Sequence, residues 1–371
     1  MNTILGPGLA GVLALACGGG ATAETTLRSA SAFGPTHIQA TALFATLGEK
    51  IAEFTDGAYG IRDFPSGLAA PGEMVTAMRD SVVDMGSMVL PYFPADFPES
   101  LLPSNLSIFG ENPVAISLAT TEYIVTCAEC QAEFARVGQV YLGSGWTPAF
   151  QVQTTRPAET LENIQGVRLR VAGSVFSEWA EYVGAQPVQL PSSEIFQAMS
   201  EGIVDGFFGN LPDMMIQQIQ TYVTDITMVN FGTFNGDSIS LRAGLWQDLT
   251  PDDRSAFIRA AMVAREAGGE AWSAMNEQAK TSAAAEGIVF HEPSEDLQEK
   301  LDAFRDHQLE AYKAKLDADG IHDGAAKIDR YLGLVEKWED ILATADGDVQ
   351  SMVDLKMQEI WSKVDLQGYG G

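Results

Sequence analysis

The feature of this sequence that most restricts its fold is a helix-to-strand unit that occurs twice. Residues 73–84 read EMVTAMRDSVVD and residues 194–205 read EIFQAMSEGIVD, so a Glu, an Ala-Met pair and a Val-Asp pair coincide at a constant offset. Each copy reads as a short amphipathic helix followed by a strand that begins at Val-Asp. Helix-to-strand steps are common in α/β proteins, so chance similarity is the alternative interpretation.

The segments before each copy extend the similarity. In the first half, a strand, a helix and a strand are predicted at 25–33, 40–54 and 59–65. In the second half, the same three elements are predicted at 166–171, 174–183 and 187–191. Both halves therefore spell β-α-β-α-β, which predicts parallel sheets covered by helices. Two such units separated by a connecting stretch predict an α/β protein of two lobes with a cleft between them.

The predicted cleft has recognisable residues, because ligands of open α/β sheets bind beyond the carboxyl ends of the strands. Those ends are Ala32-Phe33, Met88 to Tyr92, Arg170-Val171, Pro191-Ser192 and Phe207 to Asn210. Phe33, Tyr92, Ser192 and Asn210 are therefore candidate ligand-binding residues.

The remainder of the chain is predicted to be helical, at 251–285, 294–315, 331–343 and 348–364, with residues 367–371 as a frayed tail. The chain of 371 residues carries 50 acidic and 22 basic side chains, so its formal net charge is −28. Such a surface repels DNA, RNA and anionic membranes, which excludes them as partners. A small anionic ligand would need a local exception to this field.

The first residues read as a secretory signal. Leu9 to Cys17 form a short apolar run, and Ala21 to Ala23 form an A-x-A cleavage pattern before Glu24, although residues 1–8 contain no Lys or Arg. We predict a signal peptide over residues 1–23 that is cleaved on export. A buried N-terminal helix and a lipid-anchored Cys17 are the alternatives. No other stretch is long and apolar enough to span a membrane.

Cys127 and Cys130 form a CxxC pattern. A zinc site would need two more ligands, and the His residues lie far away in the sequence. A redox-active pair would need a strand-to-helix context that this motif lacks. We favour a structural disulfide formed in an oxidising compartment, and two reduced buried thiols are the alternative.

Catalytic motifs such as G-x-S-x-G, the P-loop and H-E-x-x-H do not occur in the sequence. We therefore expect a binding protein with no catalytic residue, no metal and no cofactor. The most informative residue is Arg170, at the end of a strand whose apolar positions are Val167, Leu169 and Val171. A guanidinium there would face the cleft, where it can hold a carboxylate bidentately. The alternative is that Arg168 and Arg170 both pair with acidic neighbours.

Residues 161–212, with GVRLRV, VGAQPV and PSSEIFQAMSEGIVDG, resemble the solute-binding proteins of tripartite ATP-independent periplasmic (TRAP) transporters, DctP type. The segments FPSG at 64–67 and VDMG at 83–86 are similar to that family's first lobe, and LTPDDR at 249–254 to a later helix start. The resemblance implies a two-lobed, type II-like periplasmic binding protein with a ligand cleft between the lobes and long spanning helices.

The resemblance also implies a division of the chain. Lobe I would comprise 24–147 plus 236–275, lobe II 148–235 plus 276–325, and a C-terminal helical extension 326–371. The chain would cross between the lobes near residues 146–151 and near Asn235. Arg170 would match the family's carboxylate-binding arginine. Asn210 would either match the family's asparagine or stand one place from it, because FFGN at 207–210 stands where the family reads QENP. The implied partners are a small-molecule carboxylate and the small and large permease subunits in the membrane.

The sequence departs from the family near the first crossing, where Phe150 stands in place of a second arginine. Trp146, Phe207 and Phe208 supply further rings, and Gln151 and Asn235 complete the predicted ligand-binding residues. One cation among several rings favours a monocarboxylate with an aromatic or hydrophobic body over a small dicarboxylate. An ABC-type binding protein and a secreted hydrolase that uses paired carboxylates are the alternative functions.

Overall fold

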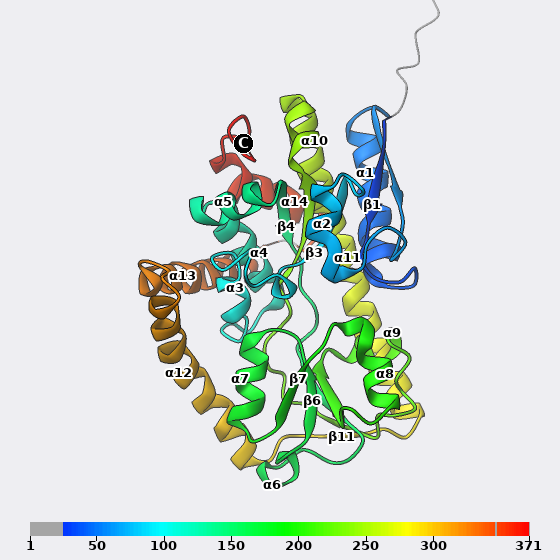
Figure 1. The fold of residues 1–371 in the computed structure, drawn as a ribbon, viewed down its shortest axis with the longest axis vertical. Coiled ribbons are helices and arrows are strands. Elements are labelled where there is room, and N and C mark those ends of the chain that lie inside the picture. Colours follow the sequence, from blue (N-terminus) through cyan, green and yellow to red (C-terminus); the bar gives the residue numbers. More distant parts are fainter. Residues whose placement is uncertain (1–24, 346, 371) are drawn as a thin grey trace, which may run out of the picture.

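The structure, a computed structural model, describes residues 25–345 and 347–370, and the predicted signal peptide lies outside the described residues. Two sheets divide these residues into two lobes, which lie one above the other in Figure 1. We call the lobe around the first sheet lobe I and the lobe around the second sheet lobe II.

Within the described residues, lobe I is built on a five-stranded sheet in the order β2-β1-β3-β10-β4. Its strands are β1 (Thr25–Ala30), β2 (Tyr59–Asp63), β3 (Met85–Val89), β4 (Gln139–Ser144) and β10 (Asp237–Arg242). Strand β1 pairs in parallel with both β2 and β3, and β10 runs antiparallel to β3 and β4. Helices α1 (Ala45–Phe54) and α2 (Met74–Arg79) connect the parallel strands.

In the part of the chain that the structure describes, lobe II is built on a six-stranded sheet in the order β11-β9-β5-β8-β6-β7. Its strands are β5 (Gln151–Thr154), β6 (Arg168–Val171), β7 (Gln186–Gln189), β8 (Gly206–Gly209), β9 (Asp225–Thr227) and β11 (Val289–His291). Strand β6 pairs in parallel with β7 and β8, which are connected through α7 (Ser174–Tyr182) and α8 (Ile195–Ser200). The order β7-β6-β8 repeats β2-β1-β3, so the predicted β-α-β-α-β unit in each half is confirmed.

Close packing of α2 on β3 depends on the glycine at position 86. A Cβ atom there would lie 2.7 Å from Met74 Sδ and 2.8 Å from Met78 Cε. Both methionines are fully buried. The small residue that follows Val83-Asp84 therefore lets the methionine face of the first repeated helix lie directly on its strand.

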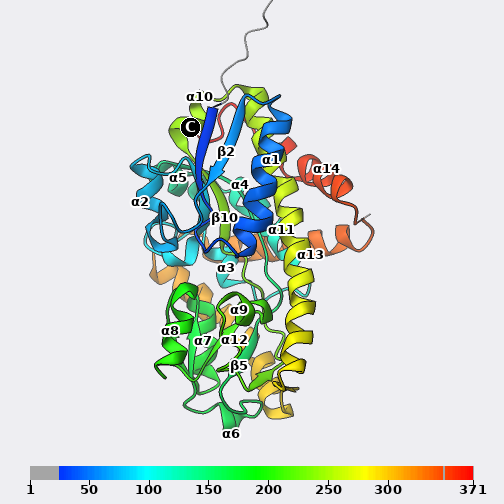
Figure 2. The same ribbon diagram turned by 90° about the vertical axis from the view of Figure 1, so that its right-hand side faces the viewer.

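Two long helices join the lobes on opposite flanks. Helix α11 (Pro251–Ala285) has the predicted bounds and runs the length of both lobes in Figure 2, packing on α1 and on α9 (Leu211–Ile216). Its start is fixed by a capping box, in which Thr250 Oγ1 accepts the N–H of Asp253 at 3.2 Å. Helix α12 (Glu295–Ala318) packs on α7 in lobe II and leads to α13 (Gly324–Leu342), which packs on α4 (Pro113–Val125).

The remaining elements are short. They are the π-helical turn η1 (Gln39–Phe44), the 3₁₀ turns η2 (Pro71–Glu73), η3 (Leu90–Tyr92), η4 (Ser192–Glu194) and η5 (Trp361–Lys363), and the helices α3 (Leu102–Asn105), α5 (Ala128–Arg136), α6 (Leu161–Ile164), α10 (Ala243–Asp248) and α14 (Val349–Glu359). Over the described residues, no helix has both the length and the hydrophobicity that crossing a membrane requires.

The C-terminal segment corrects two expectations. Helix α13 begins at Gly324 rather than at the predicted 331. The expected frayed tail is wrong, because Tyr369 is only 6% exposed. Its hydroxyl donates to Tyr141 O at 2.7 Å, and its carbonyl accepts from Trp246 Nε1 at 2.7 Å. The tail is therefore anchored on lobe I up to residue 370.

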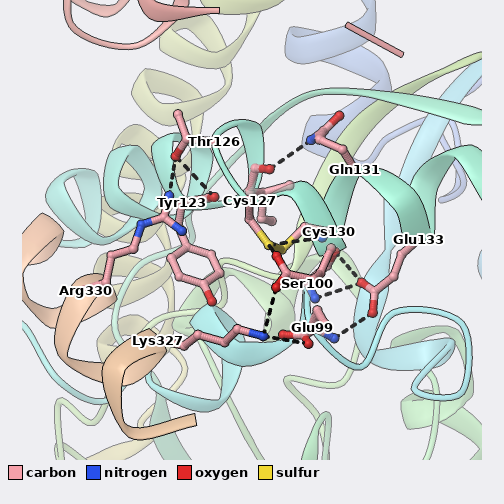
Figure 3. Close-up of a disulfide and its surroundings, with 12 residues drawn as sticks. Glu99, Ser100, Tyr123, Thr126, Cys127, Cys130, Gln131, Glu133, Lys327 and Arg330 are labelled. Carbon is pink, nitrogen blue, oxygen red and sulfur yellow. Dashed lines mark hydrogen bonds and ion pairs between the residues drawn. A yellow bond between two sulfur atoms is a disulfide. The ribbon is translucent and has the colours of Figure 1, made fainter. Parts of the chain in front are cut away.

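Cys127 and Cys130 form a disulfide at the start of α5 in lobe I (Figure 3). Cys127 is the N-cap of this helix, and its Sγ accepts the N–H of Cys130 at 3.0 Å. Glu133, one turn further along α5, accepts hydrogen bonds from the N–H of Ser100 at 2.9 Å and from its hydroxyl at 2.7 Å. Both cysteines are almost fully buried. The disulfide therefore fixes the first turn of α5 within the core of lobe I.

Candidate functional site

A cavity lies between the lobes, where the carboxyl ends of parallel strands from both sheets meet. Six predicted ligand-binding residues line it: Phe33, Tyr92, Phe150, Arg170, Ser192 and Asn210. Phe33 follows β1, Tyr92 follows β3, and Ser192 and Asn210 follow β7 and β8. The residues that follow strand ends therefore converge, as the parallel topology requires.

Trp146 and Asn235, two predicted site residues on the crossing segments, do not line this cavity. Trp146 packs on α11, where a Cβ at position 269 would lie 3.1 Å from its ring. Asn235 points into lobe I, and its Nδ2 donates to Thr120 Oγ1 on α4 at 2.8 Å. Both residues lie on the predicted crossing segments, but tertiary partners hold their side chains away from this cavity.

Gln151 and Phe207 are also held elsewhere. Gln151 exchanges two hydrogen bonds with Asn230: its Nε2 donates to Asn230 Oδ1 at 2.8 Å, and its Oε1 accepts the N–H of Asn230 at 3.0 Å. Phe207 is fully buried in the apolar core between β8 and α9. Successive strand residues alternate between faces, so Phe207 packs beneath the sheet rather than at its end.

Arg170 stands in the cavity wall at the carboxyl end of β6 and is only 3% exposed. Its Nε donates to Leu190 O at 2.8 Å, which holds the plane of the guanidinium. Within the described residues, Nη1 and Nη2 have no hydrogen-bond partner and Arg170 forms no ion pair. Two parallel N–H donors on a fixed guanidinium match the two oxygens of a carboxylate.

Arg168, two residues earlier on β6, has a different environment. Its side chain is 40% exposed and forms an ion pair with Asp205, with Nη2 2.5 Å from Oδ1. Its Nε donates to the other carboxylate oxygen at 3.0 Å. The expectation that an acidic neighbour neutralises the arginines therefore holds for Arg168 and fails for Arg170.

Asp213 on α9 brings a second charge-bearing group to the lobe II wall. Burial raises the pKa of its carboxyl to about 6, and the guanidinium of Arg170 opposes that rise. At neutral pH this carboxylate is ionised near the guanidinium. It therefore competes electrostatically with any carboxylate that enters the cavity.

The lobe I wall contains a buried ionic network. Arg265 Nη1 lies 2.7 Å from Asp237 Oδ2, and these side chains are only 6% and 8% exposed. Arg265 Nη2 also donates to Gly143 O at 3.0 Å. Gln39 Nε2 donates to the same Asp237 oxygen at 2.7 Å. Asp237 is therefore neutralised within lobe I, and among the described residues that line the cavity Arg170 is the cation available to a ligand.

His37 lies beside this network and belongs to an aromatic wall. Its ring stacks on Phe33 with centroids 4.4 Å apart and meets Trp272 of α11 edge-on at 5.8 Å. Burial lowers the pKa of His37 to about 4, although Asp237 opposes the change. His37 is therefore neutral at physiological pH. Phe150 and Phe234 add two parallel rings on the crossing segments.

Seven polar or aromatic residues at this cavity were not predicted from the sequence: His37, Gln39, Thr147, Asp213, Phe234, Asp237 and Trp272. His37 and Gln39 lie several residues after the end of β1. They would have been predicted if the candidates had included residues further beyond each strand end. Asp213 lies in the first turn of the helix after β8, so the same extension would have predicted it. Trp272 has no such local signal.

The described ranges bring no three His, Cys, Asp or Glu side chains together as a metal site. The lining of the cavity within the described residues combines the guanidinium of Arg170, the carboxyl groups of Asp213 and Asp237, neutral polar groups and aromatic walls.

Comparisons with known proteins show what the chain is similar to. Residues 29–317 match the family model of DctP, described as bacterial extracellular solute-binding protein, family 7. The protein TsaT of Comamonas testosteroni, named an outer membrane transporter protein, is 23% identical over 321 residues, which are 83% of this chain and 91% of TsaT.

Solved structures agree with this match in their fold. A TRAP periplasmic solute-binding protein from Bordetella bronchiseptica with bound (R)- and (S)-mandelate has a TM-score of 0.72 and 21% identity, covering 84% of this chain and 99% of that one. A marine metagenome TRAP solute-binding protein, specific for aromatic acid ligands and in complex with 3-hydroxybenzoate, has a TM-score of 0.73 and 20% identity, covering 85% and 99%. The predicted α/β fold of two lobes is confirmed.

Proposed function

We propose that this chain, which belongs to family 7 of the bacterial extracellular solute-binding proteins, is the receptor of a TRAP transporter and captures an organic carboxylate between its lobes. The observation that carries the proposal is Arg170, which is buried in the interlobe cavity with both Nη atoms unpaired within the described residues. Buried guanidinium N–H groups that lack hydrogen-bond acceptors destabilise a protein, so their presence favours a role in binding an anion.

The body of the ligand is aromatic or hydrophobic in this proposal. Phe33, Phe150, Phe234 and Trp272 line the cavity, and Arg265 is already paired with Asp237. One available guanidinium between aromatic walls suits a monocarboxylate better than a small dicarboxylate. The mandelate and 3-hydroxybenzoate bound by two proteins of the same fold are acids of this kind.

Capture occurs by closure of the lobes. Hydrogen bonds already join them across the cleft. The N–H of Ser192 donates to Tyr92 Oη at 3.1 Å, and Ser174 Oγ donates to Asn105 Oδ1 at 2.6 Å. The hinge comprises the segments between β4 and β5 and between β9 and β10, so the lobe boundaries lie near 147–148 and 235–236. This division is supported by the strand membership of the two sheets.

We also propose where the chain acts and which membrane proteins it meets. A signal peptide over residues 1–23 directs the chain to the periplasm, where the closed form docks on the small and large TRAP permease subunits. The chain carries out no catalysis and binds no nucleic acid. The family match favours this reading over a secreted hydrolase, because it is a family of solute-binding proteins.

Thermal unfolding with matched ligands tests the proposed function. We expect mandelate and 3-hydroxybenzoate, at concentrations a hundredfold above their dissociation constants, to raise the midpoint by about 3–4 °C. Mandelamide and 3-hydroxybenzamide should leave it unchanged, because an amide has no negative charge for Arg170. Equal stabilisation by acid and amide, or none by either, would contradict carboxylate capture. Turnover of an ester substrate would instead support the hydrolase alternative.

The pKa of Asp213 predicts a pH dependence of binding. Below about pH 6 its carboxyl is protonated, and above that value its charge repels the ligand carboxylate. We expect the affinity for 3-hydroxybenzoate, measured by calorimetry, to fall about tenfold from pH 5.5 to pH 7.5. In Asp213→Asn this decrease should disappear.

Protein stability supplies an independent readout of the same carboxyl. Its folded-state pKa of about 6 is above the ordinary 3.8, so the folded protein binds the proton more tightly than the unfolded chain. The free energy of unfolding therefore decreases as pH rises between these two values. Asp213→Asn should be more stable than the unmodified protein at pH 7 and lose that advantage below pH 4. Parallel affinity and stability profiles in both proteins would contradict the role of Asp213.

A further inference from the structure

The wall of lobe I holds a hydrogen-bond acceptor in a fixed orientation. Gln39 is 5% exposed and lines the cavity. Its Nε2 donates to Asp237 Oδ2, which also receives Nη1 of Arg265. A carboxylate that is paired with arginine accepts and does not donate, so the amide cannot be turned to place Oε1 against Asp237. Gln39 Oε1 is buried and has no hydrogen-bond partner within the described residues.

His37 places a donor on the same wall. Its Nδ1 accepts the N–H of Gln39 at 3.1 Å. Burial lowers the pKa of His37 to about 4, so the ring is neutral at pH 7 and its single proton lies on Nε2. Among the described residues, no hydrogen-bond partner approaches Nε2, and the ring lines the cavity. An acceptor and a donor thus stand two positions apart in the sequence, without partners of their own.

A hydroxyl group fits this pair of side chains better than an ammonium group or a second carboxylate does. One hydroxyl oxygen both donates and accepts, so it can satisfy Gln39 Oε1 and His37 Nε2 together. An ammonium group would leave the donor on His37 without an acceptor. A second carboxylate would approach Asp237 and the oxygen of Gln39, both of which repel it. The aromatic rings of Phe33 and Trp272 beside His37 favour a phenolic or benzylic position for the hydroxyl.

We propose that the ligand is a hydroxylated aromatic acid, whose carboxylate binds Arg170 in lobe II and whose hydroxyl binds Gln39 and His37 in lobe I. This inference rests on the proposed function, because it takes the carboxylate at Arg170 as given. A ligand of this shape contacts both lobes through polar groups, so each hydroxylated molecule bridges the cleft. The hydroxyl also pairs a buried acceptor that is otherwise unsatisfied, which makes its absence costly for binding.

Calorimetry with paired acids tests the inference on the full chain. The pairs are benzoate with 3-hydroxybenzoate, phenylacetate with its 3- and 4-hydroxy derivatives, and phenylacetate with mandelate. In at least one pair the hydroxylated acid should bind about tenfold more tightly, which corresponds to one buried hydrogen bond. Gln39→Met and His37→Phe should each reduce that preference to within twofold. His37→Phe keeps an aromatic ring beside Phe33 and removes only the nitrogen atoms.

The outcomes separate this inference from the proposed function. Equal affinities within every pair would overturn the hydroxyl site and leave carboxylate capture standing. A hydroxyl preference that survives in both variants would overturn its assignment to Gln39 and His37. Binding of none of these acids would overturn the proposed function, and the inference with it. The comparison of acids on the unmodified protein decides the main point even where a variant fails to fold.

Discussion

Replacing Arg265 by Met is expected to lower the free energy of unfolding by about 3–5 kcal/mol. Arg265 and Asp237 are only 6% and 8% exposed and are 2.7 Å apart. Removal of the guanidinium would leave the carboxylate buried with Gln39 as its remaining side-chain donor, and would leave Gly143 O without the Nη2 donor. Urea denaturation of the two proteins measures the difference.

A surface pair provides the matched control for this substitution. Arg259 Nη2 lies 2.6 Å from Asp354 Oδ1, but these side chains are 35% and 57% exposed. Arg259→Met should therefore cost less than about 1 kcal/mol. The double variant Arg265→Met with Asp237→Leu should recover part of the loss, because it buries no unpaired charge. A loss in Arg265→Met as small as that in Arg259→Met would show that the buried network does not support lobe I.

The architecture was predictable from the sequence because its signals are local. The repeated helix-to-strand unit and its flanks gave the β-α-β-α-β order of each lobe. Strand ends then identified Phe33, Tyr92, Arg170, Ser192 and Asn210, all of which line the cavity. Parallel strands bring their carboxyl ends together, so an accurate strand boundary is enough to bring such residues near one another.

The rest of the site was not predictable because it depends on contacts between distant segments. Gln39 and Asp237, whose hydrogen bond sets the lobe I wall, are separated by 198 positions. Trp272 reaches the cavity only because α11 runs past both lobes, which no local pattern in that helix indicates. Trp146 and Asn235 were predicted to lie on the crossing segments, but the direction of a side chain there depends on partners such as Thr120.

The two arginines of β6 also show that contacts between distant segments are not predictable from the local sequence. Their alternation with buried residues predicts that Arg168 and Arg170 lie on one face of the strand. Only the fold reveals that Asp205 pairs with the first and that no acidic side chain forms an ion pair with the second within the described residues. In a chain with a net charge of −28, this difference between neighbouring arginines distinguishes a structural ion pair from a candidate anion site.

The binding of 3-hydroxybenzoate to Arg170→Met, measured by calorimetry beside Arg168→Met, tests the central claim most directly. Arg170 offers two unpaired Nη donors in the cavity, and a charge-assisted bidentate contact of this kind is strong. We expect its replacement to weaken binding at least about 100-fold, equivalent to about 2.7 kcal/mol.

Arg168 and Arg170 lie on the same strand, β6, and both are replaced by Met, so Arg168→Met is the matched control. Arg168→Met should change the affinity by less than about threefold, because that side chain is paired with Asp205 at the surface. Arg170→Lys should retain part of the affinity, since it keeps the charge and loses the planar pair of donors. The account predicts that Arg170→Met stays folded, by its thermal transition, and loses the acid. Unchanged affinity in folded Arg170→Met would contradict it.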